Sequence, residues 1–190
     1  MFDEYVTLAH ERGYTPMLHA SNSAAALRFP GLQYDMVRLG LAMYGYHPVG
    51  HPVPGVDLIP ILKWETSVVH IKEIQPGEAV SYGLKFVAER PMKIATLPVG
   101  YGDGYNRCLS GKAEVLIHGV RARQLGAICM DQMMVDVTEI PDVKIDDVAV
   151  LIGSQGKETI TADEVAEWAD TISYEILLSI SERVPRRFIR

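Results

Sequence analysis

The first part of the chain alternates between helical and extended hydrophobic patterns. Between Phe2 and Arg12, the apolar residues Phe2, Val6 and Ala9 recur at helical spacing, and Gly13 follows as a helix stop. This stretch therefore predicts a helix. The pattern that follows predicts a strand at Pro16–Ala20, a helix at Ala24–Phe29, a strand at Met36–Leu39 and a short helical stretch from Gly40 to Tyr44.

Three small polar residues, Ser21, Asn22 and Ser23, separate the first of these strands from its helix, and any of them can cap the helix. A repeated order of strand, capped turn and helix is typical of parallel α/β units. Two such units cannot close a sheet by themselves. We therefore expect exposed apolar edges here, which indicates a truncated chain.

A break follows at residues 46–60, where His47–Pro60 reads HPVGHPVPGVDLIP; its prolines and glycines predict a linker or an irregular loop. Beyond it the pattern changes to short strands rich in valine and isoleucine, which predicts a mostly antiparallel β domain. The expected strands are Trp64–Ile74, Met92–Val99, Ala113–Ile117, Val120–Leu125, Met133–Val137 and Val148–Ile152.

Two local signals refine this β-rich region. His118-Gly119 lies between two expected strands and predicts a tight hairpin, since glycine readily supplies a positive φ. Thr161, with Glu164 three residues later, forms a capping-box pattern that opens a helix running through Trp168. The region is thus expected to carry one helical insertion. The last eight residues, RVPRRFIR, contain four arginines, but their apolar residues favour a closing strand over a nucleic-acid contact.

Composition narrows the function classes. The chain has 190 residues, 48% of them apolar and 22% charged, and a net charge of -6, which together favour a soluble globular protein and argue against nucleic acid or a membrane surface as partner. No apolar run is long enough for a membrane helix. The N-terminus is charged from its third residue, unlike a secretory signal. Only Cys108 and Cys129 are present, which fits a reducing cytoplasm.

Two candidate ligand-binding positions lie in the α/β region. Asn22 and Ser23 stand at a strand-to-helix junction, where free amides and the helix dipole favour an anion such as phosphate, although an ordinary N-cap gives the same pattern. Arg38 ends an expected strand just before Gly40, so a guanidinium and an accessible backbone can face one ligand. A simple salt bridge is the alternative for Arg38.

Tyrosines recur in glycine-rich turns of the β-rich region. Tyr82 precedes Gly83 in AVSYGLKF, and Tyr101 and Tyr105 lie among three glycines in LPVGYGDGYNR. Such a tyrosine commonly packs as an aromatic plug with its hydroxyl satisfied. It can instead act as a general base where a nearby cation lowers the pKa of the phenol.

The stretch GAICMDQMM, Gly126–Met134, sets Cys129, Met130, Asp131 and Gln132 side by side between apolar residues. It fits a metal or redox site, a buried strand and turn, or a loop whose backbone holds a ligand. The chain contains no CxxC and no HExxH motif, which counts against the first interpretation.

Several stretches, taken in order, resemble one family: HASNSAA, MVRLGLAMYG, AVSYG, LPVGYGDGY, GAICMDQMMVDVT and ISYE, spread from His19 to Glu175. Each is moderately specific, but their ordered succession is highly specific. The chain resembles the C-terminal half of the pyridoxal-phosphate alanine racemase family, in which an N-terminal eight-stranded barrel precedes a β-rich domain. The resemblance implies an α+β fold class, with residues 1–46 as the last β/α units of a TIM-type barrel that binds the cofactor and residues 47–190 as the mostly antiparallel β domain with a helical insertion.

The resemblance also implies roles for cofactor-binding residues. Ser23 matches the serine that binds the phosphate of pyridoxal 5′-phosphate, Gly40 and Leu41 match the backbone donors beside it, and Tyr174 matches another phosphate contact. Arg38 matches the arginine that faces the pyridine nitrogen. Because a guanidinium only donates hydrogen bonds, Arg38 would keep that nitrogen unprotonated and the cofactor a mild electron sink.

Racemisation needs a base on each face of the substrate Cα, and Tyr82 matches the tyrosine that acts opposite the cofactor lysine. Met130 matches the residue whose main-chain N–H holds the substrate carboxylate, and Tyr101 and Arg107 match residues that line the substrate's path. In the family, the β domain of one subunit leans over the barrel of the other. Tyr82 and Met130 would therefore serve the partner's cofactor, and activity would require a homodimer.

The implied activity interconverts L- and D-alanine and supplies D-alanine for peptidoglycan, in the cytoplasm and without a metal. Two departures limit this expectation. The first lysine of the chain is Lys63, in the β domain, so the cofactor's lysine anchor is not in this chain and the fragment alone is expected to be inactive. Ala127 stands where many family members carry an arginine in the channel to the site.

Other interpretations stay open at this point. The chain could come from a serine or alanine racemase fused to a membrane segment. It could be a non-catalytic β module that binds a small molecule or a partner protein, with Tyr82 merely packed. It could also be an inactive truncation, which is compatible with the racemase interpretation.

Overall fold

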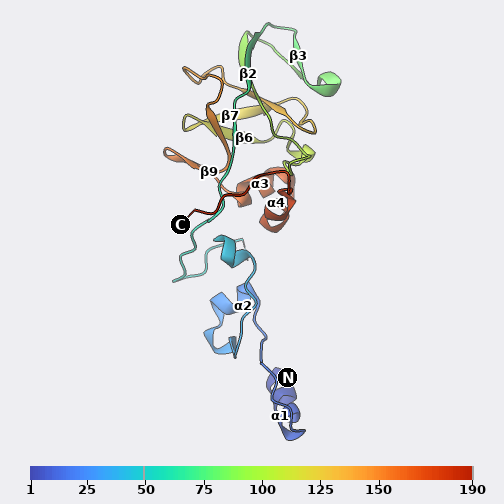
Figure 1. Ribbon diagram of the computed structural model, residues 1–190, viewed down its shortest axis with the longest axis vertical. Helices are drawn as coiled ribbons and strands as arrows, with labels where there is room; N and C mark the ends of the chain where they lie inside the picture. Colours follow the sequence, from blue (N-terminus) through green and yellow to red (C-terminus); the bar gives the residue numbers. More distant parts are fainter. Residues whose placement is uncertain (49, 190) are drawn as a thin grey trace. The chain divides into compact units, whose positions relative to one another are not determined.

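The chain forms two compact units, Met1–Ile61 and Leu62–Arg190, in a computed structural model that describes residues 1–48 and 50–189 (Figure 1). Val49, which belongs to the expected linker, and Arg190, which ends the expected closing strand, lie outside the described residues. Within the described ranges, no helix is both long enough and apolar enough to cross a membrane.

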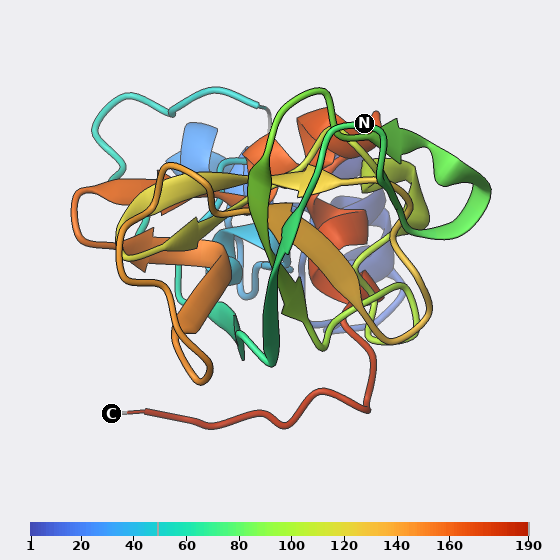
Figure 2. The ribbon, with the colours of Figure 1, turned by 90° about the horizontal axis from the view of Figure 1, so that it is seen from above.

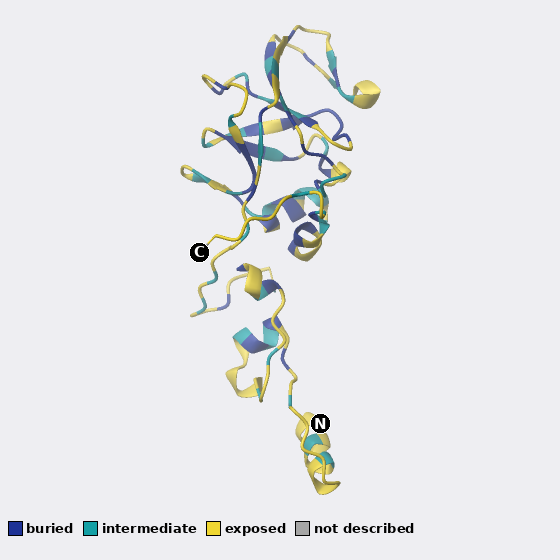
Figure 3. Cartoon of the chain, in the orientation of Figure 1, coloured by how far each residue is buried: buried dark blue, intermediate teal, exposed yellow. Residues whose placement is uncertain are grey.

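Unit 1 is built from short helices, and its first helix confirms the prediction. Helix α1 spans Phe2–Glu11 and buries none of its residues, so Figure 3 shows it mostly exposed. Helix α2 spans Ser23–Arg28, with Asn22 as its N-cap accepting a hydrogen bond from the Ala25 N–H at 3.1 Å. Two 3₁₀ helices follow, η1 at Pro30–Leu32 and η2 at Leu41–Tyr44.

The strands expected at Pro16–Ala20 and Met36–Leu39 are wrong as strands. The two segments do run side by side, but the one β-bridge in the described part of unit 1 joins Asn22 to Arg38, in parallel. The Arg38 N–H donates to the Ser21 carbonyl at 2.8 Å. A parallel strand is stable only within a sheet whose faces are covered, and unit 1 has no such sheet among the described residues. The exposed apolar edges expected from sequence are present, for example at Met17 and Phe29.

The last residues of unit 1 fold back on an earlier part of the same unit. Gly45 has φ +84°, and a Cβ built on it would lie 2.0 Å from the Ile59 carbonyl oxygen. Only glycine permits both this φ and this approach. The Ile61 N–H also donates to the Tyr44 carbonyl at 3.3 Å. The proline-rich segment is therefore irregular, as expected, but it is anchored at its far end.

Unit 2 is a twisted, antiparallel sheet, visible from above in Figure 2. Its hydrogen-bonded order is β1 (Trp64–Ser67), β9 (Val148–Gln155), β6 (Glu114–Ile117), β7 (Val120–Leu125), β8 (Met133–Asp136), β5 (Met92–Leu97) and β2 (His70–Ile74), with β10 (Glu158–Ile160) also on β9. A separate two-stranded ribbon joins β3 (Ala79–Val80) to β4 (Phe86–Val87). These findings confirm the α+β class and the mostly antiparallel domain.

One expected strand proves to be two. Residues Trp64–Ile74 break at Val68 and Val69, because β1 pairs with β9 while β2 pairs with β5 on the other side of the sheet. The Val68 N–H donates to the Asp147 carbonyl and the Val69 N–H to the Thr96 carbonyl. A single straight strand cannot pair with both β9 and β5, so the chain changes direction at Val68 and Val69.

The turn and cap signals are confirmed. His118 (φ 54°) and Gly119 (φ 75°) both have the positive φ of a tight hairpin turn between β6 and β7. Thr161 caps α3 (Ala162–Ala169) by accepting a hydrogen bond from the Glu164 N–H at 3.1 Å. The Glu164 carboxylate instead bonds the Arg121 guanidinium. A further helix, α4 (Ser173–Ser179), was not predicted.

The core of unit 2 is mostly apolar, and strand β9 runs through it. Its residues from Ala149 to Ile152 are all fully buried. The expected closing strand at the C-terminus is wrong, since residues 180–189 contain no strand. Phe188 and Ile189 are each 94% exposed, so the apolar residues that suggested a strand pack against nothing.

Candidate active site

One hydrogen bond joins two of the unit 1 residues that the resemblance assigns to a phosphate, Ser23 and Gly40. Ser23 is buried at the start of α2, and its Oγ accepts the Gly40 N–H at 2.8 Å. Gly40 immediately precedes η2, so Leu41 provides the first N–H of that helix, which has no intrahelical acceptor. Accepting from Gly40 leaves the Ser23 hydroxyl hydrogen free to donate. The structure thus brings Ser23, Gly40 and Leu41 into one polar turn suited to an anion.

Arg38 is held by a residue that the sequence interpretation overlooked. Its Nη1 lies 2.9 Å from His19 Nδ1 and 3.3 Å from the His19 carbonyl, and its Nη2 lies 3.4 Å from the Ala20 carbonyl. Because a guanidinium has no acceptor, His19 Nδ1 must accept, which places the imidazole hydrogen on Nε2. The remaining N–H groups of Arg38 are available to a ligand. The signal for His19 was its position at the start of the HASNSAA stretch.

Tyr82 lies at an exposed turn of unit 2. It opens the 3₁₀ helix η3 (Tyr82–Leu84) between β3 and β4, and its side chain is 74% exposed. Within the described residues, the Tyr82 hydroxyl has no hydrogen-bond partner. The alternative of a packed aromatic plug therefore does not fit Tyr82. Tyr105 does pack as an aromatic plug, buried edge-to-face against Trp64 with ring centroids 5.8 Å apart, but its buried hydroxyl has no hydrogen-bond partner among the described residues.

The stretch that contains Met130 forms a loop whose backbone is held at several points. The Tyr101 N–H donates to the Cys129 carbonyl at 3.1 Å and the Gly102 N–H to the Met130 carbonyl at 2.9 Å. A Cβ on Gly100 would lie 2.1 Å from the Cys129 carbonyl oxygen, so only glycine permits this approach. The Met130 N–H has no acceptor among the described residues. The loop therefore presents a backbone donor that makes no hydrogen bond within the described residues.

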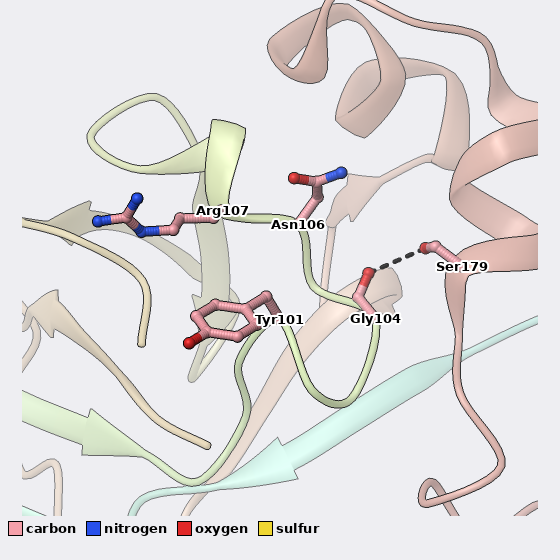
Figure 4. A pocket seen from close by; sticks show the side chains of 5 residues that line it. All are labelled: Tyr101, Gly104, Asn106, Arg107 and Ser179. Carbon is pink, nitrogen blue, oxygen red and sulfur yellow. Dashed lines mark hydrogen bonds between the residues drawn. The ribbon is translucent and has the colours of Figure 1, made fainter. Parts of the chain in front are cut away.

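Tyr101 and Arg107 line a shallow open pocket of about 360 Å³ together with Gly104, Asn106 and Ser179 (Figure 4). Arg107 opens the 3₁₀ helix η4 (Arg107–Leu109), which Asn106 caps through the Cys108 N–H. Ser179, at the end of α4, donates to the Gly104 carbonyl at 2.9 Å. In Figure 4 the Arg107 guanidinium and the Tyr101 phenol extend to the same side, away from Ser179.

The remaining sequence-predicted residue, Tyr174, lies in the first turn of α4 and is 38% exposed. Among the described residues, no hydrogen bond or ring contact joins Tyr174 to Tyr82 or Met130. Of the predicted residues, Ser23, Arg38, Gly40 and Leu41 lie in unit 1, and Tyr82, Tyr101, Arg107, Met130 and Tyr174 lie in unit 2.

Sequence reasoning also missed the residues that brace the Met130 loop from the C-terminal segment. The Arg183 guanidinium pairs with Asp131 at 2.6 Å and with Asp103 at 3.5 Å. The Asp131 hydrogen bond, ahead of the Asp103 charge, raises the pKa of Arg183. The four arginines of RVPRRFIR indicated that this segment needs acidic partners. Sequence alone could not identify Asp103 and Asp131 as those partners.

Both cysteines are free, Cys108 exposed and Cys129 buried. No cluster of three or more His, Cys, Asp or Glu side chains within residues 1–48 and 50–189 is placed to hold a metal ion. Chemically, unit 1 offers a polar turn and an arginine, and unit 2 offers an exposed phenol and a backbone donor without a partner among the described residues.

These features define a class of protein: short helices with a polar turn around Ser23, followed by an antiparallel β domain that exposes Tyr82. Two family models match the chain, the alanine racemase N-terminal domain over residues 1–48 and the alanine racemase C-terminal domain over residues 61–188. The chain belongs to the alanine racemase family.

Similar proteins extend this result. An alanine racemase of Halothermothrix orenii is 51% identical over 173 residues, 91% of this chain and 46% of that protein. The crystal structure of alanine racemase from Bacillus anthracis with bound L-Ala-P is 42% identical, with a TM-score of 0.92 over 100% of this chain and 49% of that one. An alanine racemase of Clostridium difficile in complex with cycloserine has a TM-score of 0.89 and 37% identity over 96% of this chain and 48% of that one. The chain thus spans about half the length of these relatives.

Proposed function

We propose that this chain is the C-terminal half of an amino-acid racemase that interconverts L- and D-alanine by a two-base, pyridoxal-phosphate-dependent reaction. Family membership supports the reaction class, and the names of the relatives support alanine as substrate. The product D-alanine would supply peptidoglycan synthesis. Residues 1–46 would be the end of the cofactor-binding barrel and residues 47–190 the β domain.

The observation that carries the proposal is the pairing of an exposed phenol with a free backbone donor in unit 2. Tyr82 is 74% exposed although it follows a buried strand residue, Val80. The Met130 N–H is unpaired among the described residues while the carbonyls on either side of it are bonded. Tyr82 would take or give the proton at the substrate Cα, and the Met130 N–H would hold the substrate carboxylate.

The residues of this chain fit the cofactor, apart from its lysine anchor. The free hydroxyl hydrogen of Ser23 and the N–H of Leu41 suit the phosphate, with Gly40 leaving room beside them and Tyr174 as a further contact. Arg38, held by His19, would donate to the pyridine nitrogen. When bound, pyridoxal phosphate supplies an electron sink for the carbanion at Cα.

The substrate path would run by Tyr101 and Arg107, which line the open pocket. Arg107 would attract the carboxylate of the incoming amino acid. Ala127 is buried, so it adds no charge to such a path.

A homodimer with shared active sites is part of the proposal. A phenol acts as a base near neutral pH only beside a positive charge. Within the described residues, no hydrogen bond from lysine or arginine reaches the Tyr82 hydroxyl, so we infer that the charge comes from the partner subunit's barrel. The two free cysteines support a reducing, cytoplasmic location.

The test uses the chain assembled with a separately produced N-terminal half of the family and pyridoxal phosphate. Racemisation of L-alanine is followed by loss of optical rotation, and cofactor binding by visible absorbance. Replacing Tyr82→Phe should lower kcat by about 10²- to 10⁴-fold, the usual contribution of a general base, while cofactor absorbance is retained. Tyr5→Phe, at a tyrosine that is 67% exposed on α1, is the matched control and should leave kcat unchanged.

If the assembled pair binds cofactor and Tyr82→Phe racemises alanine as fast as the parent, the role of Tyr82 is wrong. If the pair binds cofactor but racemises no amino acid, a binding module becomes the better interpretation. Faster turnover of serine than of alanine would instead identify a serine racemase.

A further inference from the structure

We propose that Ser81 is a positioning residue that sets the direction of the Tyr82 side chain by fastening the Tyr82 turn to the segment that carries Met130. The inference rests on the function proposed above for Tyr82 and Met130 and adds a residue to it. Ser81 would act through Tyr82 and would not touch the substrate.

The backbone of Ser81 adopts a conformation that few side chains accept. Its φ is 67° and its ψ is -179°, a region occupied almost only by glycine. Residues other than glycine remain in such regions only where their surroundings enforce it, and these positions cluster at functional sites. Ser81 directly precedes Tyr82, so its dihedral angles determine where the phenol leaves the turn.

The Ser81 side chain makes the contact that holds this conformation. Its Oγ donates to the Ala127 carbonyl at 2.6 Å and lies 3.5 Å from Cys129 Sγ. Ala127 and Cys129 lie in the segment that leads directly into Met130. One hydroxyl therefore connects the residue before the proposed base to the residue before the proposed carboxylate donor.

The opposite segment is shaped to receive Ser81. Gly126 has φ +69°, and a Cβ built on it would lie 2.6 Å from the Val80 carbonyl oxygen and 3.0 Å from Ser81 Cβ. A side chain at Gly126 would push the two segments apart. Both segments therefore contribute to the close approach of residues 80–81 to residues 126–127. Ser81 supplies the hydrogen bond, and Gly126 supplies the space.

Both segments are also anchored behind the contact. Val80 is buried in an apolar cluster that includes Ile94 and Leu125, and the Cys129 carbonyl accepts the Tyr101 N–H. The Tyr82 turn is thus held by the buried Val80 that precedes it, while Tyr82 itself is exposed to solvent. This arrangement suits a base that must meet a substrate presented by another element.

The experiment separates the hydroxyl from the backbone strain. Ser81→Gly suits the observed dihedral angles but lacks the hydroxyl, whereas Ser81→Ala lacks the hydroxyl and keeps the strain. Ser154→Ala is the control, because its hydroxyl makes a comparable 2.8 Å hydrogen bond, to Thr159, between β9 and β10. Kinetics are measured on the chain assembled with the N-terminal half and pyridoxal phosphate. Amide hydrogen exchange and melting are measured on the 190-residue chain alone.

For Ser81→Gly we expect kcat to fall about 10- to 100-fold with KM changed less than about 3-fold, as for a misplaced catalytic group. The kinetic isotope effect on kcat with Cα-deuterated alanine should rise, because proton transfer becomes slower. Amide exchange in the hydrogen-bonded β3–β4 ribbon that carries the Tyr82 turn should accelerate while the melting temperature stays at the parent value. Ser81→Ala should show the same kinetic loss and a lower melting temperature, and Ser154→Ala none of these changes.

The outcomes distinguish the two proposals. If Tyr82→Phe is impaired but Ser81→Gly keeps the parent kcat and isotope effect, the positioning role is overturned and the proposed function stands. A fall in kcat for Ser81→Gly without faster exchange in the β3–β4 ribbon also overturns it, because the hydroxyl would then act by another route. If Tyr82→Phe itself is unimpaired, the proposed function fails first.

Discussion

Both units contain hydrophobic patterns that predict strands, but the two units differ in how many of those strands form. Unit 1 forms helices and one β-bridge, and its α1 buries no residue. Unit 2 forms an eight-stranded sheet from its own strands, in which Leu116 and its neighbours are fully buried. Parallel β/α units need further strands on both sides, whereas an antiparallel domain pairs its own successive strands. A hydrophobic pattern therefore produces a strand only where the chain also supplies its neighbour.

The first test of this comparison removes one leucine from each unit. Leu116→Ala in β6 should lower the free energy of unfolding by about 2–5 kcal/mol, because it opens a cavity in a packed core. Leu8→Ala on α1, where the side chain is 40% exposed, should change it by less than about 0.5 kcal/mol. Urea unfolding followed by far-UV circular dichroism measures both. Equal losses would mean that unit 1 has a core after all.

The second test concerns charged groups that tie distant elements of unit 2 together. The Arg121 guanidinium on β7 bonds Glu158 on β10 at 3.0 Å, Glu164 on α3 at 2.6 Å and Glu114 on β6 at 3.1 Å. Its pKa is raised above the ordinary arginine value, mainly by Glu164. Unit 1 contains no comparable network among its described residues.

Arg121→Gln should lower the free energy of unfolding by about 1–3 kcal/mol, because three half-buried carboxylates lose their shared donor. Arg123→Gln, an exposed arginine on the same strand, should change it by less than about 0.5 kcal/mol. Urea unfolding at low and high salt provides the measurement, and the Arg121 effect should shrink at high salt. An equal effect at both positions would show that the network adds no stability.

The third and smallest expected effect is a dependence on pH. Asp147 accepts hydrogen bonds from the Lys144 N–H and from His118 Nε2, both at 2.8 Å. The Lys144 N–H, and then the charge of His118, hold the pKa of Asp147 below its ordinary value of 3.8, against the opposing effect of burial. The folded state thus binds this proton less readily than the unfolded chain.

The sign of the dependence follows from that shift. The stability contributed by Asp147 is present above the unfolded pKa and is lost as pH falls through the lower folded pKa. The free energy of unfolding should therefore decline more steeply below about pH 4 in the parent than in Asp147→Asn. Asp142→Asn, at an exposed turn residue with φ 57°, should follow the parent. Parallel curves for the parent and Asp147→Asn would contradict the assignment.

Sequence reasoning succeeded where the signal was local. The helix that begins at Phe2, the cap at Thr161 and the turn at His118 depend on a few adjacent residues, and the structure confirms them. It failed at Pro16–Ala20, at Met36–Leu39 and at the C-terminal segment, because strand formation depends on partners elsewhere. The break at Val68 was hidden for the same reason.

The candidate site shows the same division. Ser23 and Gly40 were singled out separately, and a hydrogen bond joins them. The roles of Tyr82 and Met130 came from resemblance and stay predictions. Ser81 and Arg183 could not be found from sequence, because the contacts that single them out span 46 and 52 residues. The residues next to Ser81 in the sequence do not reveal its strained φ. The residues next to Arg183 do not reveal the distant carboxylates with which it pairs.

The burial of Trp64 against Tyr105 has a practical consequence for following this molecule in solution. The chain has two tryptophans, Trp64 and Trp168, and both belong to unit 2. Indole emission therefore reports on the β domain and is silent about α1 and α2. An emission trace and a backbone-sensitive signal recorded on one sample would reveal whether the two halves lose their order together.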